Sequence, residues 1–291
     1  ITMKQHFPQY TLAVLLALTL VGCHGPEYDD VVYDSAETYE YGHEEGTTIN
    51  GWTVTCDGPF ILFHNSSALN DGTLFGDATL ESYSGLGVYR ATFYNGAALK
   101  IYANGNAHIT DFSSATSFGL PGTSNVYVEA AGWVEASTMT NINLTVLTEK
   151  SDILASAITG GILDLRGASV TLGRIQNSDN VTIQASNQVT MDEAIESKKD
   201  LSVSGLVTQD TIYPTPAITI GHILIAEGKI SISGTSVTGK NPNAYFSARS
   251  FEIVAADTVD IQQRFVGGDE LQVTANKDVQ LGSLQGISGS T

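Results

Sequence analysis

The segment NVTIQASNQVTM, residues 180–191, decides the fold, because apolar residues alternate along it in two short arms. The small or apolar residues of these arms are Val181, Ile183, Ala185, Val189 and Met191. An apolar residue at every second position is typical of a β-strand with one buried face. The segment therefore predicts two short strands joined by a turn, with a small residue at the corner.

The same template occurs again towards the C-terminus. Residues 251–261 and 271–281 repeat it position by position, and residues 163–172 repeat it with one residue deleted. First arms of further units begin at Val126, Ile142, Leu201 and Ile223. Successive units start about 21 residues apart on average, and the longest step contains the insertion GKNPN at residues 239–243. The chain from residue 125 to 291 therefore consists of structural repeats.

A unit of this length cannot bury its own apolar face, so it has to stack on its neighbours. Stacked parallel strands lie about 4.8 Å apart and bury a continuous column of Val, Ile and Leu. We therefore predict an all-β fold, a parallel β-helix or β-solenoid. A β-sandwich also has short alternating strands and is the alternative, but its strands do not usually repeat one template at near-constant spacing.

The repeats at residues 180–191 and 270–281 resemble the repeats, about 20 residues long, of filamentous haemagglutinin-type adhesins. The resemblance extends over about residues 125–290. It implies a right-handed parallel β-helix at a bacterial surface, with a role in adhesion. Adhesins of this type normally leave the cell through a dedicated outer-membrane partner, and the N-terminus of this chain points to a different export route.

The first residues have the pattern of a secretory signal. An apolar run of 11 residues, Thr11–Val21, follows Met3 and Lys4 and is too short to span a bilayer. The end of this run and the two residues after it, Leu20-Val21-Gly22-Cys23, resemble a bacterial lipobox. This resemblance implies a lipoprotein signal peptide at residues 1–22 and lipid attachment at Cys23. The alternative is an ordinary cleaved signal, in which case Cys23 could form a disulfide with Cys56.

An acidic segment follows the signal. Residues 23–49 contain eight carboxylates and neither Lys nor Arg. Like charges repel and extend a chain, so we expect an acidic tether between the lipid and the folded domain. The D-x-D-x-D-G spacing of a calcium loop is absent, so the carboxylates predict no metal site.

Residues 50–124 are rich in aromatic side chains and precede the clear repeats. A solenoid needs its open end covered, so we expect an N-terminal β cap and the first coils here. The alternative is a small carbohydrate-binding module that uses surface aromatics. At the other end, Gly286–Thr291 stops just after a well-formed repeat, so we expect the natural chain to continue.

Composition excludes other classes of function. The chain has 291 residues and a formal net charge of −18, yet only 15% of its residues are charged. An acidic surface repels a phosphate backbone, so we expect no nucleic-acid partner. Two cysteines cannot build a disulfide framework.

The template predicts two columns of outward side chains, and these columns contain mainly hydroxyls and amides. The first column holds Asp164, Thr182, Ser202, Leu224, Glu252 and Gln272, and the second holds Thr171, Thr190, Ser231, Asp260 and Gln280. No two carboxylates occupy neighbouring repeats of one column, so we predict no catalytic residues.

Neither the histidines nor Cys56 predict a reactive site. The six histidines lack metal-binding spacing, with His43 in the expected tether and His64, His108 and His222 isolated. Cys56 is expected to be a small core residue. We predict no metal and no cofactor.

These features together predict a bacterial cell-surface lipoprotein, adhesin-like or structural, anchored through its N-terminal lipid at the cell surface or outer membrane. Its polar solenoid faces would bind a polysaccharide, a matrix or surface protein, or another cell. The alternatives are an extracellular polysaccharide-degrading β-helix enzyme, and a structural subunit whose open end stacks on other copies.

Overall fold

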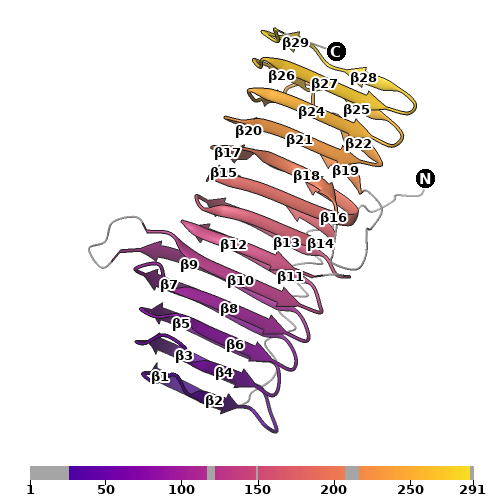
Figure 1. The fold of residues 1–291 in the computed structure, drawn as a ribbon. Coiled ribbons are helices and arrows are strands. Elements are labelled where there is room, and N and C mark those ends of the chain that lie inside the picture. Colours follow the sequence, from indigo (N-terminus) through magenta and orange to yellow (C-terminus); the bar gives the residue numbers. More distant parts are fainter. Residues whose placement is uncertain (1–25, 117–121, 149, 207–215, 289–291) are drawn as a thin grey trace, which may run out of the picture.

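The fold is a parallel β-solenoid, as the repeats predict. The structure is a computed structural model that describes residues 26–116, 122–148, 150–206 and 216–288. These residues contain strands and no helix, and the strands stack in about 12 turns from β1 to β29 (Figure 1). All the strand pairs are parallel, which excludes the β-sandwich. Among the described residues no helix is long and apolar enough to cross a membrane.

One strand of every coil belongs to a continuous column that we call ladder B. Its members are β2 (Thr38–Tyr41), β4 (Phe60–Phe63), β6 (Ala78–Ser82), β8 (Ala98–Ala103), β10 (Ser124–Ala130), β12 (Ile142–Leu147), the first part of β14 (Ile162–Leu172), the first part of β16 (Asn180–Met191), β18 (Leu201–Gly205), β21 (Lys229–Gly234), β24 (Ser250–Ala255) and β27 (Glu270–Ala275).

A second column, ladder A, begins with longer strands. It contains β1 (Glu27–Tyr33), β3 (Thr47–Val54), β5 (Ser67–Leu74), β7 (Leu86–Tyr94), β9 (Ala107–Ala115), β11 (Val134–Thr140) and β13 (Ile153–Thr159). It continues through the ends of β14 and β16 into β19 (Ala217–Ile220), β22 (Ser236–Gly239), β25 (Val259–Ile261) and β28 (Val279–Leu281). A third column, ladder C, holds β15 (Ile175–Ser178), β17 (Ile195–Ser197), β20 (Leu224–Ala226), β23 (Tyr245–Ser247), β26 (Arg264–Val266) and β29 (Leu284–Gln285).

The long strands of ladder A bend at one equivalent position in each coil. Seven residues with positive φ occupy this position, namely Asp30, Gly51, Asp71, Arg90, Asp111, Thr138 and Ala157. The strand pairings on either side keep these residues in register. Gly, Asp and Asn adopt a left-handed backbone most readily, and four of the first five coils use Asp or Gly where the chain turns a corner. In later coils the strand ends at this corner. The residues after the corner form a separate strand, which belongs to ladder C.

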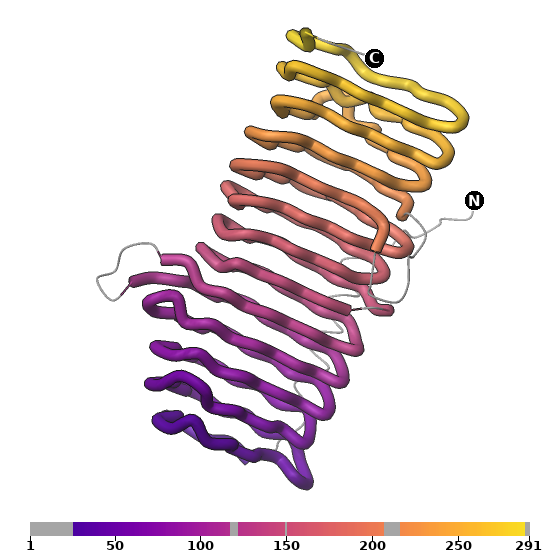
Figure 2. The backbone as a smooth tube through the Cα atoms, viewed as in Figure 1, coloured from indigo at the N-terminus to yellow at the C-terminus, as the bar shows by residue number. Residues whose placement is uncertain are grey.

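The coils stack one on another (Figure 2). Their buried side chains form one continuous core. Val181 lies beside Leu201, and Leu201 beside Ile230, at one position of ladder B. Aromatic side chains fill the interior of the first coils, including Trp52, Phe63, Phe93 and Phe112. Residues 50–115 are therefore regular coils, continuous in register with the repeats that follow.

The acidic segment is not a tether from Glu27 onward, because it forms the first coil. Strand β1 pairs with β3, and β2 pairs with β4. Tyr33 is fully buried and packs against Tyr39, with ring centroids 4.8 Å apart. The carboxylates lie on the outside, where water solvates them, so their repulsion does not prevent the tyrosines from building a core.

The predicted register is wrong in one coil. Leu224 is fully buried in β20, although the template places it outward. Ser231 does point outward, but it lies beside Ser202 in ladder B and not in the second column. The stretch Ile223–Ala226 is apolar at every position, so alternation cannot fix which side chains face the core.

Candidate functional site

An open groove of about 510 Å³ lies where four strands of ladder B end, namely β6, β8, β10 and β12. Its lining combines carboxylates, a tyrosine, a lysine and small residues: Glu81, Tyr102, Ala103, Asn104, Glu129, Ala130, Ala131, Leu147 and Lys150. Alanines follow both Tyr102 and Glu129, at the ends of β8 and β10. Both alanines are buried in the core, so the polar side chains beside them border the groove.

A smaller hollow of about 120 Å³ lies on the same strands, over their first halves. It is lined by Ala98, Leu99, Lys100, Asn125, Val126, Tyr127, Asn143 and Thr145. The two hollows together extend along β8, β10 and β12, with Tyr102 in one lining and Tyr127 in the other.

The register of ladder B arranges the groove residues in two adjacent columns. Glu81, Tyr102, Glu129, Leu147 and Arg166 form one column on successive coils. Lys100, Tyr127, Thr145 and Asp164 form the other. Each coil thus contributes one or two polar or aromatic side chains to a single face.

Two tyrosines form the aromatic part of this face. The rings of Tyr102 and Tyr127 lie on neighbouring coils, with centroids 5.9 Å apart and planes tilted by 54°. The Tyr127 hydroxyl donates a hydrogen bond of 2.9 Å to Glu129 Oε2. Burial, this hydrogen bond and the nearby negative charge raise the pKa of Tyr127 to about 12, so the phenol stays neutral. Further along the face, Arg166 is paired with Asp164, with 2.7 Å between Nη2 and Oδ2.

The arrangement suits a sugar chain better than a small reactive molecule. Tyrosine rings offer an apolar face together with a polar edge. Carboxylates, amides and hydroxyls beside them can donate to or accept from sugar hydroxyls, with the charged groups making the stronger bonds. The groove is open, so it can hold part of a polymer without enclosing its end.

A second polar surface lies on ladder A. Thr171, Thr190, Thr219 and Thr238 stand in one column on four successive coils, which continues with Asp260 and Gln280. The predicted neighbours Asp164 and Thr182, Thr182 and Ser202, and Glu252 and Gln272 are also confirmed in ladder B. The prediction that hydroxyls and amides dominate these columns is therefore correct outside the misplaced coil.

Sequence reasoning missed the groove. Glu81 and Glu129 occupy one column on either side of Tyr102. They are 48 residues apart in the sequence, and the intervening coils differ in length. The predicted outward columns began only at residue 164, so they contained neither residue. The aromatic richness of residues 50–124 was the signal that could have found this face.

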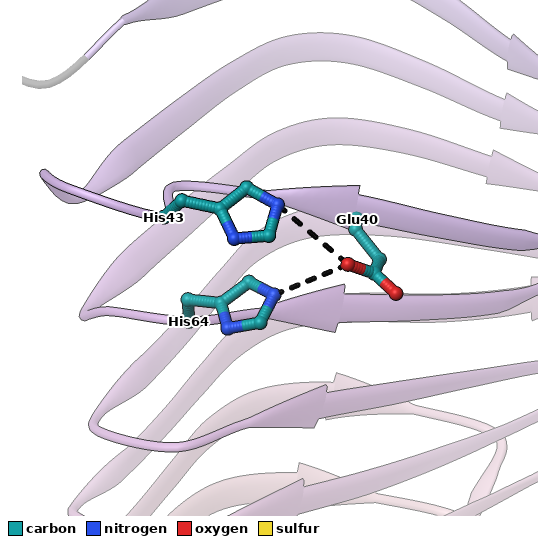
Figure 3. Close-up of side chains that lie close together, drawn as sticks. All are labelled: Glu40, His43 and His64. Carbon is teal, nitrogen blue, oxygen red and sulfur yellow. Dashed lines mark hydrogen bonds and ion pairs between the residues drawn. The ribbon is translucent and has the colours of Figure 1, made fainter.

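The histidines and cysteines that were considered from the sequence have different surroundings. His43, which was expected in the tether, and His64, which the sequence leaves isolated, meet at Glu40 on neighbouring coils (Figure 3). His108 lies 3.9 Å from Glu135 and beside the ring of Tyr89. Two further residues stand apart: His222 is exposed, and Cys56 is half-buried in the turn after β3, not in a core strand. Cys23 and the signal peptide lie outside the described residues.

Comparison of the chain with protein-family models, with curated proteins and with solved structures found no match.

Proposed function

We propose that this chain is an adhesin-like β-solenoid that binds a neutral polysaccharide through the groove on ladder B. One observation supports the proposal most strongly. Tyr102, Tyr127 and Glu129 lie together beside an open groove of about 510 Å³. Aromatic rings and hydrogen-bonding groups on a rigid sheet are held in place before the ligand arrives, which lowers the entropic cost of binding.

The charge of the chain favours a neutral polymer over an anionic one. The formal net charge is −18, and the groove holds two carboxylates, Glu81 and Glu129, against one lysine, Lys150. An anionic polysaccharide would meet repulsion from this surface. A neutral polysaccharide meets no such repulsion, and its hydroxyls can donate hydrogen bonds to the carboxylates.

The flat polar columns extend the binding surface beyond the groove. The threonine column of ladder A offers a hydroxyl at each coil, about 4.8 Å apart. Many weak contacts of this kind act together on a repeating ligand, because each further contact is made at a high effective concentration.

We further propose that lipid at Cys23 anchors the solenoid at the bacterial cell surface or outer membrane. The lipobox-like sequence Leu20–Cys23 supports this part of the proposal. Each buried methylene of a lipid contributes about 0.8 kcal/mol, so several acyl chains hold a soluble rod at a membrane durably. Display at a surface is the position from which an adhesive face can meet its ligand.

A polysaccharide-degrading enzyme is the second candidate, and one observation favours it. Glu81 and Glu129 lie two coils apart in one column, so their backbones are about 9.6 Å apart. Carboxyl groups of inverting glycoside hydrolases are separated by about 6.5–9.5 Å. Tyr102 stands between the two carboxylates, on the coil where a catalytic water would have to lie, and this favours binding over hydrolysis.

A glycan array read together with a panel of matrix proteins tests the class of ligand. We expect the full chain to bind neutral polysaccharides and to release no reducing ends from them. Binding confined to matrix proteins would contradict the carbohydrate proposal. Release of reducing ends that is lost in Glu81→Gln would establish the enzyme instead.

A further inference from the structure

Three side chains with metal-binding chemistry meet on the first two coils, away from the groove. Glu40 lies at the end of β2, His43 follows in the turn to β3, and His64 follows β4. Figure 3 shows both imidazole rings beside the same carboxylate, with dashed lines from each ring to Glu40. Glu40 Oε2 is 3.3 Å from Nε2 of His64 and 3.6 Å from Nε2 of His43.

The coil repeat brings the two histidines together. Tyr41 and Phe63 are paired at the ends of β2 and β4, so the turns that follow them stack directly. The backbone N–H of His64 donates to the carbonyl of Tyr41 over 3.0 Å, which fixes the second turn against the first. The rings of His43 and His64 then stack with centroids 4.0 Å apart and planes inclined by 28°.

The distances suit a shared cation better than two hydrogen bonds. An N–H···O hydrogen bond has its most common length near 2.9–3.0 Å, and an approach of 3.6 Å is too long to be one. Ligand atoms about 2.1 Å from a tetrahedral metal lie about 3.4 Å from each other. The two Glu40-to-histidine distances fall on either side of this value. The same carboxylate oxygen faces both rings, as expected if this oxygen and the two rings bind one ion.

The surroundings attract cations and leave room for one. The sequence contains no Lys or Arg between Lys4 and Arg90, and Glu44 and Glu45 flank the same turn. Of the three ligand side chains, His64 is 24% exposed, Glu40 49% and His43 65%, so water can reach the cluster. A cation would have three protein ligands and an open position for water.

From this geometry we propose that Glu40, His43 and His64 form a site for a divalent transition metal, with Zn²⁺ as the representative ion. Two imidazoles and one carboxylate suit Zn²⁺, Cu²⁺ or Ni²⁺, whereas Ca²⁺ and Mg²⁺ prefer oxygen ligands alone. The metal would join the first coil to the second. It would stabilise the first described coil, which among the described residues has a neighbouring coil on only one side.

Isothermal titration of the full chain with Zn²⁺, without a histidine tag, tests the proposal. We expect about one equivalent of Zn²⁺ per chain, with Ca²⁺ and Mg²⁺ failing to compete. His43→Gln and His64→Gln should each weaken Zn²⁺ binding at least about tenfold. Electron paramagnetic resonance with Cu²⁺ should detect two imidazole nitrogens in the parent chain and one in either variant.

His108→Gln is the matched control, because His108, like His64, is half-buried and faces a glutamate on the neighbouring coil, whereas the rings beside it are those of Tyr89 and Trp133. This variant should bind Zn²⁺ as the parent does. Thermal unfolding without metal identifies any variant that fails to fold, and Glu40→Gln gives a second test that removes only the charge. Two results would overturn the proposal. One is the absence of saturable Zn²⁺ binding by the parent chain. The other is Zn²⁺ binding by His43→Gln, His64→Gln and Glu40→Gln that is as tight as that of the parent.

Discussion

Tyr127 and Glu129 point outward from the same strand, β10, and the Tyr127 hydroxyl donates a hydrogen bond of 2.9 Å to the Glu129 carboxylate. The bond holds the Tyr127 hydroxyl at the Glu129 carboxylate, and Glu129 also lines the groove. It also joins the two hollows, because Tyr127 lines one and Glu129 lines the other.

This bond predicts a loss of stability in alkali. Burial and Glu129 raise the pKa of Tyr127 from 10.0 to about 12 in the folded chain. Below the ordinary value the phenol is neutral in both states and its contribution is fully present. Between pH 10.0 and about 12 the unfolded chain releases the proton first, so the contribution is lost as pH rises. Denaturant titration across this pH range should show a smaller decline in the free energy of unfolding for Tyr127→Phe than for the parent. An identical decline in the two proteins would contradict the assignment of this pH dependence to Tyr127.

Substitution of Gly72 should destabilise the first coils. The indole of Trp52 lies against Gly72 on the neighbouring coil, and a Cβ at Gly72 would overlap the ring. We expect Gly72→Ala to lower the free energy of unfolding by about 1–3 kcal/mol, the usual cost of overpacking. A double-mutant cycle with Trp52→Phe checks the cause, because the smaller ring should reduce the cost of the alanine. Additive effects would mean that Trp52 is not responsible.

The corner of ladder A predicts a stabilising substitution. Ala157 has φ of 52°, a conformation that costs a residue with a Cβ roughly 1–2 kcal/mol. Glycine removes this strain but makes the unfolded chain more flexible, so Ala157→Gly should stabilise by about 0.5 kcal/mol. Ala155→Gly is the control in the same strand, since Ala155 is fully buried with an ordinary backbone, and it should destabilise. Chemical denaturation of both variants measures the difference, and a loss of stability in Ala157→Gly would be inconsistent with strain at this corner.

The lipid anchor is tested by mass spectrometry of the mature N-terminus after expression in a bacterial host. We expect the mature chain to begin at Cys23 and to carry acyl chains. Cys23→Ala should lack them and should leave the membrane fraction. An unmodified Cys23 in the mature parent chain would remove the anchor from the account.

The fold was predictable because its signal is local. Alternation of apolar residues in a template such as residues 271–281 requires only a strand with one buried face. The same signal fails at Ile223–Ala226, where consecutive apolar residues leave the phase of the strand undetermined. It also failed at residues 27–41, because the net charge favoured an extended tether, whereas Tyr33 and Tyr39 pack together in the first coil.

The candidate sites were less predictable because they depend on register between coils. Tyr102 and Glu129 become neighbours only when β8 and β10 pair across a long connection. His43 and His64 approach each other only because two turns stack. Coil length varies along the chain, so no fixed sequence spacing identifies such neighbours.

The central claim is that a neutral polysaccharide binds at the groove on ladder B, and the affinities of two tyrosine variants test it most directly. Tyr102→Ala removes an aromatic ring from the groove, whereas Tyr245→Ala removes one from β23 on another ladder, several coils away. Titration with a polysaccharide selected on the array should give about tenfold weaker binding for Tyr102→Ala and unchanged binding for Tyr245→Ala. Equal affinity of the parent chain and Tyr102→Ala, with both folded, would contradict the claim.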